Sequence, residues 1–175
     1  MKKLYLLFFI FSLSSNIFAS DLGYRSFGVK LGVALPEDPW STGFVIGANA
    51  DMGEIIDDLN LVPSISYWHG GGDFGTIDIN YSNIQIAGDV HYHIKNVKGL
   101  YAGGGISINI LTTDIPSFSV WGYSTEDYSD TSTNFGIAVL SGYEMEIAGF
   151  KAYGEAKYNL ISDFNTFEIL IGVYF

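Results

Sequence analysis

The carboxy-terminal segment constrains the fold of this chain more than any other feature. Residues 167–175 read Phe-Glu-Ile-Leu-Ile-Gly-Val-Tyr-Phe. Successive side chains of a β-strand point to opposite faces of the sheet, so this order predicts a strand with one continuous apolar face. That face consists of Phe167, Ile169, Ile171, Val173 and Phe175. Such a strand needs an apolar environment along its whole length, which is either lipid or a protein core.

The amino-terminal residues predict export across a membrane. Lys2 and Lys3 precede an apolar run over residues 4–13, and the small residues Ala19 and Ser20 follow. This order is typical of a secretory signal peptide. We predict a signal peptide over residues 1–19, with cleavage after residue 19 or 20, and one domain over residues 20–175. No later apolar stretch reaches the roughly 20 residues that a membrane-spanning helix needs, so a membrane location would require strands.

Composition excludes two further classes of protein. Without the signal peptide the chain has six Lys and Arg against nineteen Asp and Glu, a net charge of about −13, which argues against a nucleic-acid partner. The chain has no Cys, which excludes disulfides and thiol chemistry. Stability must therefore come from closure of the sheet and from the surrounding medium.

Eight segments share the alternation of the carboxy-terminal strand. They cover residues 27–35, 43–51, 59–67, 82–94, 100–110, 134–139 with a blurred continuation to 143, 150–160 and 167–175. Because the number of strands is even, both chain termini are expected on one side. Pro63 interrupts the third segment and indicates a sheet edge or a bulge, because proline cannot donate to the ladder.

The connections between these segments alternate in character. One set covers residues 36–42, 69–81, 111–133 and 161–166, and the other covers residues 52–58, 95–99 and 144–149. In bacterial outer-membrane barrels the periplasmic turns are short and the surface loops are longer. The long connection 111–133 falls on the surface side in this arrangement, although 52–58 is longer than a periplasmic turn requires.

Alternation alone fits a barrel that is apolar outside and also a soluble, lipocalin-like barrel that is apolar inside. The polar face of these segments is rich in Gly, Ser, Asn and Lys, which suits a narrow, packed lumen, and outward Lys and Glu are too few to cover a soluble surface. Trp40, Tyr67, Trp68 and Phe135 fit an aromatic girdle at the membrane interface. We therefore predict an all-β fold, an eight-stranded antiparallel up-and-down transmembrane β-barrel. A periplasmic lipocalin-like carrier is the alternative.

With this pattern the mature chain resembles the small eight-stranded outer-membrane barrels of the OmpA/OmpX type, and more loosely the opacity-protein and "porin family" surface antigens. The most specific element is the terminal Phe175 together with Phe167, Ile169, Ile171 and Val173. The resemblance implies that this segment is the signal read by the barrel-assembly machinery, and that outer-membrane lipid surrounds the protein. It implies no activity, because fold does not dictate function.

The polar face carries a set of ionisable residues that we expect to form a structural network in the lumen. Its members are Lys30, Asp89, His91, His93, Glu155, Lys157 and Glu168. Asp89, His91 and His93 alternate along one strand, about 6.5 to 7 Å apart, and could ligate a metal. The network is favoured because charges in so narrow a lumen must pair. We predict no metal site, no cofactor and no continuous aqueous pore.

Two functional alternatives remain beside a structural or surface-contact role. One is a narrow gated channel for small solutes. The other is a lipid-modifying enzyme, for which His69 and Asp73 with Ser66 or Ser82 are the local candidates. The sequence contains no nucleophile elbow, so we predict no catalytic residues.

The 111–133 segment is the expected site of contact with a protein or a glycan. It carries Trp121, Tyr123 and Tyr128 among Ser, Thr and Asp. The predicted surface connections contain nine acidic residues and no Lys or Arg. We therefore expect a monomeric outer-membrane protein of the bacterial envelope that contacts its partners through exposed loops.

Overall fold

The computed structural model describes residues 22–37, 40–74, 77–117, 119–120, 123–124, 126–162 and 164–175, and every regular element in this part of the chain is a β-strand. The strands are β1 Leu22–Pro36, β2 Gly43–Ile56, β3 Leu59–Phe74, β4 Ile77–His93, β5 Leu100–Ile115, β6 Ser119–Val120, β7 Tyr123–Ser124, β8 Tyr128–Ile147, β9 Phe150–Ile161 and β10 Thr166–Tyr174. Among the described residues, no helix is long and apolar enough to cross a membrane. The predicted signal peptide lies outside the described residues.

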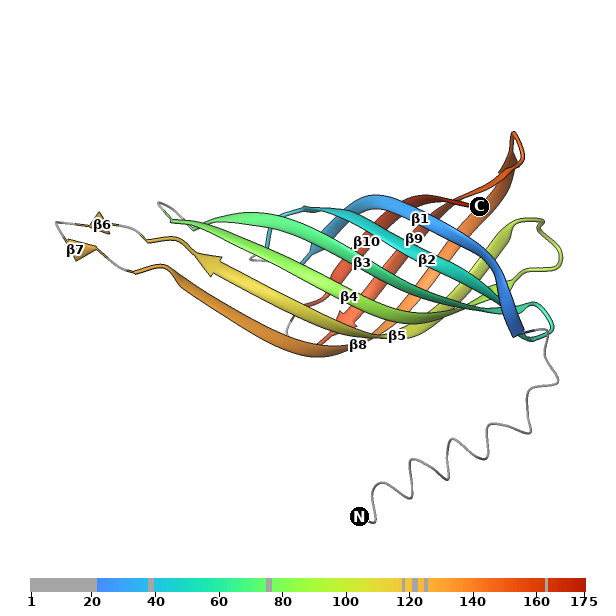
Figure 1. The fold of residues 1–175 in the computed structure, drawn as a ribbon, viewed down its shortest axis with the longest axis horizontal. Coiled ribbons are helices and arrows are strands. Elements are labelled where there is room, and N and C mark those ends of the chain that lie inside the picture. Colours follow the sequence, from blue (N-terminus) through green and yellow to red (C-terminus); the bar gives the residue numbers. More distant parts are fainter. Residues whose placement is uncertain are drawn as a thin grey trace, which may run out of the picture.

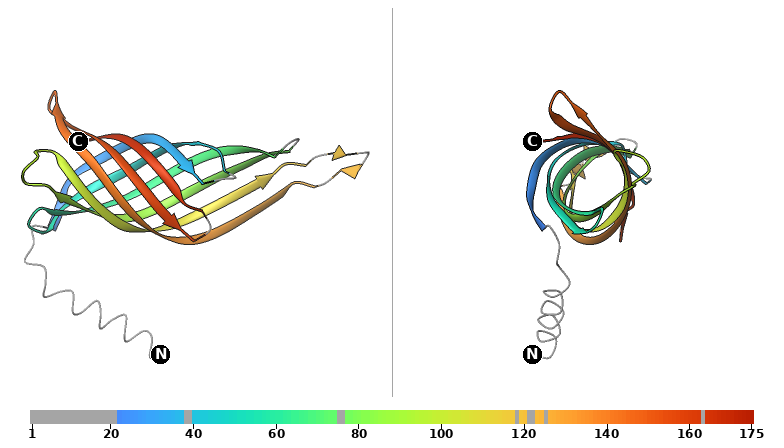
Figure 2. Two further views of the ribbon diagram at one scale, coloured as in Figure 1. Left: turned by 180° about the vertical axis from the view of Figure 1, so that it is seen from behind. Right: turned by 90° about the vertical axis from the view of Figure 1, so that its right-hand side faces the viewer.

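Eight of these strands form one closed sheet. Its order is β1-β10-β9-β8-β5-β4-β3-β2, with β2 returning to β1, and every pairing is antiparallel (Figures 1 and 2). Strands β1 and β10 close the ring from Gly28↔Tyr174 to Pro36↔Thr166. Two backbone hydrogen bonds between Phe27 and Phe175 continue this seam. The predicted eight-stranded up-and-down barrel is therefore confirmed.

The two ends of the barrel differ. At one end, called the terminal end here, β1 begins and β10 ends, and the tight turn after β2 and the hairpin turn before β9 lie there as well (Figure 1). At the other end, the distal end, β3, β4, β5 and β8 run beyond the remaining strands (Figure 1). Strand β3 pairs with β2 only as far as His69, and β8 pairs with β9 only as far as Gly136. The strand segments past these points form a projecting sheet, whose edges are residues 70–74 and 128–135.

The strands are longer than the alternation predicts, and the bounds of four predicted connections are wrong. Residues 52–56, 69–74, 77–81 and 144–147 belong to strands, and the 111–133 connection contains the end of β5, the start of β8 and the short ribbon of β6 and β7. The turn after β2 shrinks to two residues, with Asp58 at a positive φ of 65°. Backbone pairing continues beyond the segments of alternating polarity. Outside the bilayer both faces of a strand meet water, so the polarity of a side chain no longer indicates the face on which it lies.

Apolar side chains cover the outside of the barrel, as predicted. On β8 the outward Ile137 is 51% exposed, whereas its inward neighbour Ala138 is 7% exposed. The outward faces of β1, β4, β5 and β10 repeat this pattern. So large an exposed apolar surface suits hydrocarbon and not water. The lipocalin-like alternative, which requires the apolar face inside, is wrong.

The distal part of the lumen is filled by an apolar cluster that the sequence analysis missed. Its members are Ala34, Val45, Trp68, Tyr81, Leu111, Ile161, Phe164 and Leu170, with Trp40 packed against them. Tyr81 makes edge-on ring contacts with Trp40 and Trp68, at centroid distances of 4.8 and 5.5 Å. The prediction that Trp40 and Trp68 belong to a girdle at the membrane interface is wrong, because both pack in this cluster. Trp68 follows the outward Tyr67 on β3, so it must point inward.

Candidate functional site

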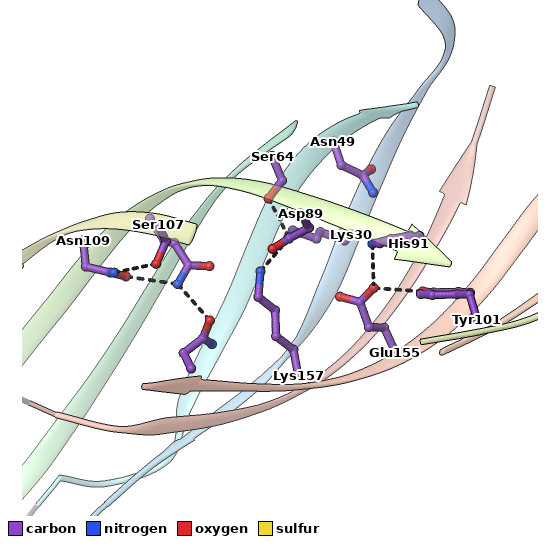
Figure 3. Close-up of polar contacts among 12 residues, drawn as sticks. Lys30, Asn49, Ser64, Asp89, His91, Tyr101, Ser107, Asn109, Glu155 and Lys157 are labelled. Atoms are coloured by element: carbon purple, nitrogen blue, oxygen red, sulfur yellow. Dashed lines mark hydrogen bonds and ion pairs between the residues drawn. The ribbon is translucent and has the colours of Figure 1, made fainter. Parts of the chain in front are cut away.

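An ionic cluster fills the middle of the lumen (Figure 3). Lys157 on β9 reaches across to Asp89 on β4, and its Nζ lies 2.6 Å from Asp89 Oδ2. Lys157 is fully buried and Asp89 is 3% exposed. Inward side chains of two non-adjacent strands thus form an ion pair that water does not reach.

A second group of contacts surrounds Glu155 on the same strand. The Tyr101 hydroxyl donates to Glu155 Oε2 at 2.8 Å, and His91 Nε2 lies 3.7 Å from the same oxygen (Figure 3). The His91 and Tyr101 rings stack, with centroids 4.4 Å apart and planes 11° apart. The imidazole is therefore held between an aromatic face and a carboxylate.

The remaining two charges of the cluster have weaker contacts. Lys30 Nζ donates to Ser64 Oγ at 3.3 Å. Glu168 is 1% exposed, and neither of its carboxylate oxygens has a hydrogen-bond partner among the described residues. It lies opposite Lys157 in the β10–β9 register. Three carboxylates therefore share two ammonium groups, and Glu168 depends on charge attraction instead of a direct contact.

A layer of amides separates this cluster from the apolar closure, and the sequence analysis did not identify it as a network. Asn109 accepts from Asn83 Nδ2 at 3.2 Å and from Gln85 Nε2 at 3.0 Å, and its own amide donates to Ser107 at 2.9 Å. Gln85 also donates to Asn159 at 3.4 Å. The signal was present in the sequence, because these residues are the inward positions of the fourth, fifth and seventh alternating segments.

His93 lies at the terminal-end edge of the cluster, where its ring contacts Tyr101 at a centroid distance of 5.9 Å. It is partly exposed and lines a cavity of about 660 Å³ at the terminal end, together with Asp51 and Glu144. Asp89 and His91 point to the contacts described above. In the described part of the chain, no three His, Cys, Asp or Glu side chains are placed to hold a metal ion.

The described side chains among the residues considered for lipid modification share no hydrogen bond. Ser66 is buried on the lumen side, whereas His69 is exposed on the other face of β3. Ser82 is the cross-strand partner of His69, but their described side chains share no hydrogen bond. The side chain of Asp73 lies outside the described structure.

Of the three predicted contact residues, one lies on the projecting sheet, one lies in the short ribbon of β6 and β7, and one lies outside the described residues. Tyr128 begins β8 and is 60% exposed. Tyr123 lies in β7, where only the backbone is described, and Trp121 is outside the described residues. The five apolar residues of the carboxy-terminal segment lie on the outer face of the barrel.

Comparison with known proteins shows which solved structures share this fold. No family model matches the chain, and no curated protein matches it. Ail, the attachment invasion locus protein of Yersinia pestis, superposes with a TM-score of 0.56 at 14% identity, covering 87% of this chain and 97% of Ail. The chain has the fold of the small eight-stranded outer-membrane barrels. Neisserial surface protein A superposes on this transmembrane barrel with a TM-score of 0.55 at 14% identity and the same coverage. At this identity the likeness shows the fold.

Proposed function

We propose that the protein is a non-catalytic integral outer-membrane barrel whose role is surface contact, and that the projecting sheet makes this contact. The observation that carries the proposal is the free edge of β8. Over residues 128–135 this strand pairs with β5 alone among the described strands. Its other edge presents backbone groups that can pair with an extended segment of another polypeptide.

The sequence of this edge favours pairing. Proteins usually blunt an exposed edge strand with Lys, Pro or a bulge. Residues 128–135 contain neither Lys nor Pro, and their register with β5 is continuous. An edge left open in this way fits a surface that binds a strand.

The charge of the projecting sheet indicates the kind of partner that it binds. Asp114, Glu126, Asp127 and Asp130 lie on or beside the projecting sheet, and residues 111–133 contain no Lys or Arg. We therefore propose an extended polypeptide segment carrying Lys or Arg. Ail has been crystallised with the heparin analogue sucrose octasulfate, in a structure that superposes with a TM-score of 0.54 at 15% identity and covers 87% of this chain and 97% of Ail. The acidic sheet of the present protein repels such a polyanion, so we do not propose heparin-like glycans.

The closed lumen argues against the channel alternative. The apolar cluster around Trp68 and Tyr81 fills the distal end, and the amide layer and the ionic cluster lie beneath it. A solute would have to displace all three layers. We propose a monomer with its terminal end in the periplasm, exported by the predicted signal peptide and inserted by the barrel-assembly machinery.

A peptide-binding experiment tests this function. The barrel in phospholipid bilayers is mixed with a synthetic peptide of alternating Thr, Val and Lys, and amide hydrogen exchange is followed by mass spectrometry. We expect the peptide to slow exchange along residues 128–135. Asp130→Lys should weaken binding, whereas Glu146→Lys, the same charge change at the terminal end, should not. Protection elsewhere in the barrel, or equal binding to both variants, would refute the proposal.

A further inference from the structure

A groove runs along the outer wall of the barrel near the terminal end. It has a volume of about 470 Å³ and is lined by Val29, Leu31, Met145, Gly154, Ile171 and Val173. In the view along the barrel, the β8–β9 hairpin stands away from the ring close to the carboxy terminus (Figure 2). The groove follows this hairpin at its root, between Met145 on one side and β10 and β1 on the other.

Small residues on β9 make the floor of the groove low. The outward positions of β9 that line the groove are Ala152 and Gly154, and their partners on β10, Val173 and Ile171, carry larger side chains. Gly154 lies directly opposite Ile171, and Ile171 lies opposite Leu31. A Cβ atom built on Gly154 would have no heavy atom within 4 Å beyond its chain neighbours. The space above Gly154 therefore holds no other protein atoms, and it lies beside the branched side chains of Ile171 and Leu31.

We propose that this groove binds one acyl chain of a phospholipid. It lies within the apolar belt that faces hydrocarbon, where Leu31 and Ile171 are 44% and 64% exposed. Dispersion contacts add up with the number of neighbouring atoms. A chain in the groove touches protein on its floor and on both sides, whereas a chain on the convex wall touches protein on one side. The inference rests on the proposed membrane location and assigns the lipid to the leaflet at the terminal end.

Two glycine positions provide a matched test. Gly154→Leu fills the floor of the groove. Gly88→Leu adds the same side chain to the outward face of β4, where an added Cβ also meets nothing within 4 Å and which lies outside the groove. Each barrel is folded in vesicles of phosphatidylethanolamine and phosphatidylglycerol, extracted in mild detergent and weighed by native mass spectrometry.

We expect wild type and Gly88→Leu to retain a one-phospholipid adduct, and Gly154→Leu to lose it. Heat-modifiable gel migration shows separately that all three proteins fold in the bilayer, so failure of the membrane location differs visibly from failure of the groove. Retention by Gly154→Leu, or absence of the adduct from wild type, would overturn the proposal. A dimer that Gly154→Leu abolishes would also overturn it, because a second copy would then occupy the groove.

Discussion

Replacing Lys157 by Met tests whether the centre of the lumen is as dry as the structure indicates. The substitution keeps the length of the side chain and removes its charge. It leaves Asp89 buried without the ammonium that lies 2.6 Å away. Glu155 and Glu168 lose the attraction of the same group, so one remaining lysine, Lys30, faces three carboxylates.

The expected cost follows from burial. For unit charges 2.6 Å apart, Coulomb's law gives about 6 kcal/mol at an effective dielectric constant of about 20. Desolvation of the two ions takes back several kcal/mol each, so the intact pair contributes little net stability. Removing one partner leaves the desolvation of the other uncompensated, which typically costs about 3–5 kcal/mol. We therefore expect Lys157→Met to lower the unfolding free energy by about that amount.

The chain contains a control pair with the same separation. Lys95 Nζ lies 2.6 Å from Asp58 Oδ2 in the turns of the terminal end, where the two side chains are 67% and 29% exposed. The hydrogen bond to Asp58 raises the pKa of Lys95. Because water screens this pair, Lys95→Met should change stability little. The two ion pairs have the same N–O distance and differ in burial, so the difference between the two variants measures the effect of the surrounding medium on stability.

Urea unfolding in bilayers, followed by tryptophan fluorescence, measures both variants. A double-mutant cycle with Asp89→Leu completes the test, since the double variant should recover most of the stability lost by Lys157→Met. If Lys157→Met and Lys95→Met cost the same, or if Asp89→Leu gives no recovery, the lumen is hydrated and this reasoning is wrong.

Three further substitutions test other parts of the barrel in the same unfolding assay. Ile171→Lys places a charge on the lipid-facing wall and should cost about 2–4 kcal/mol, whereas a wall that tolerates it would not face hydrocarbon. Asn109→Ser removes the acceptor shared by Asn83 and Gln85 and should cost about 1–3 kcal/mol, because it leaves the buried amide of Asn83 unpaired and Gln85 with its 3.4 Å bond to Asn159 alone. Ala148 has a positive φ of 51° before a glycine, so Ala148→Asn, which suits this hairpin turn, should stabilise by about 1 kcal/mol; no gain would mean that the turn relaxes without cost.

Faces could be predicted from the sequence because the side-chain period of a strand is fixed at two. The prediction of faces fails where the polarity of a side chain does not match the face of the sheet on which it lies. At the blurred end of the sixth predicted segment, Leu140 is buried in the lumen, whereas Ser141 is exposed on the outer face. The Ser141 hydroxyl donates to the backbone carbonyl of Tyr101 at 3.1 Å, which satisfies it on an apolar wall. Alternation of burial continues there although alternation of polarity has stopped.

Partners in the lumen could not be predicted from the sequence. The ionisable set was identifiable because its members occupy inward positions, but pairing depends on which strands face each other across the barrel. Lys157 and Asp89 are 68 residues apart and lie on strands that are not neighbours in the sheet. The apolar closure at the distal end was missed for a related reason. Its four aromatic residues come from two strands, β3 and β4, and from the two connections that hold Trp40 and Phe164, so no single segment shows it.

The position of the charges explains why the barrel keeps an ionic cluster that adds little net stability. A slip of one residue in the register of β9 would turn its inward face toward lipid. Glu155 and Lys157 would then lie on the outer wall, where a lysine alone costs about 2–4 kcal/mol near the bilayer midplane. Lys30 on β1 sets a similar penalty for that strand, and Glu168 on β10 sets a smaller one. The apolar outward side chains do not by themselves fix one register, and the buried charges make one register more favourable than the rest.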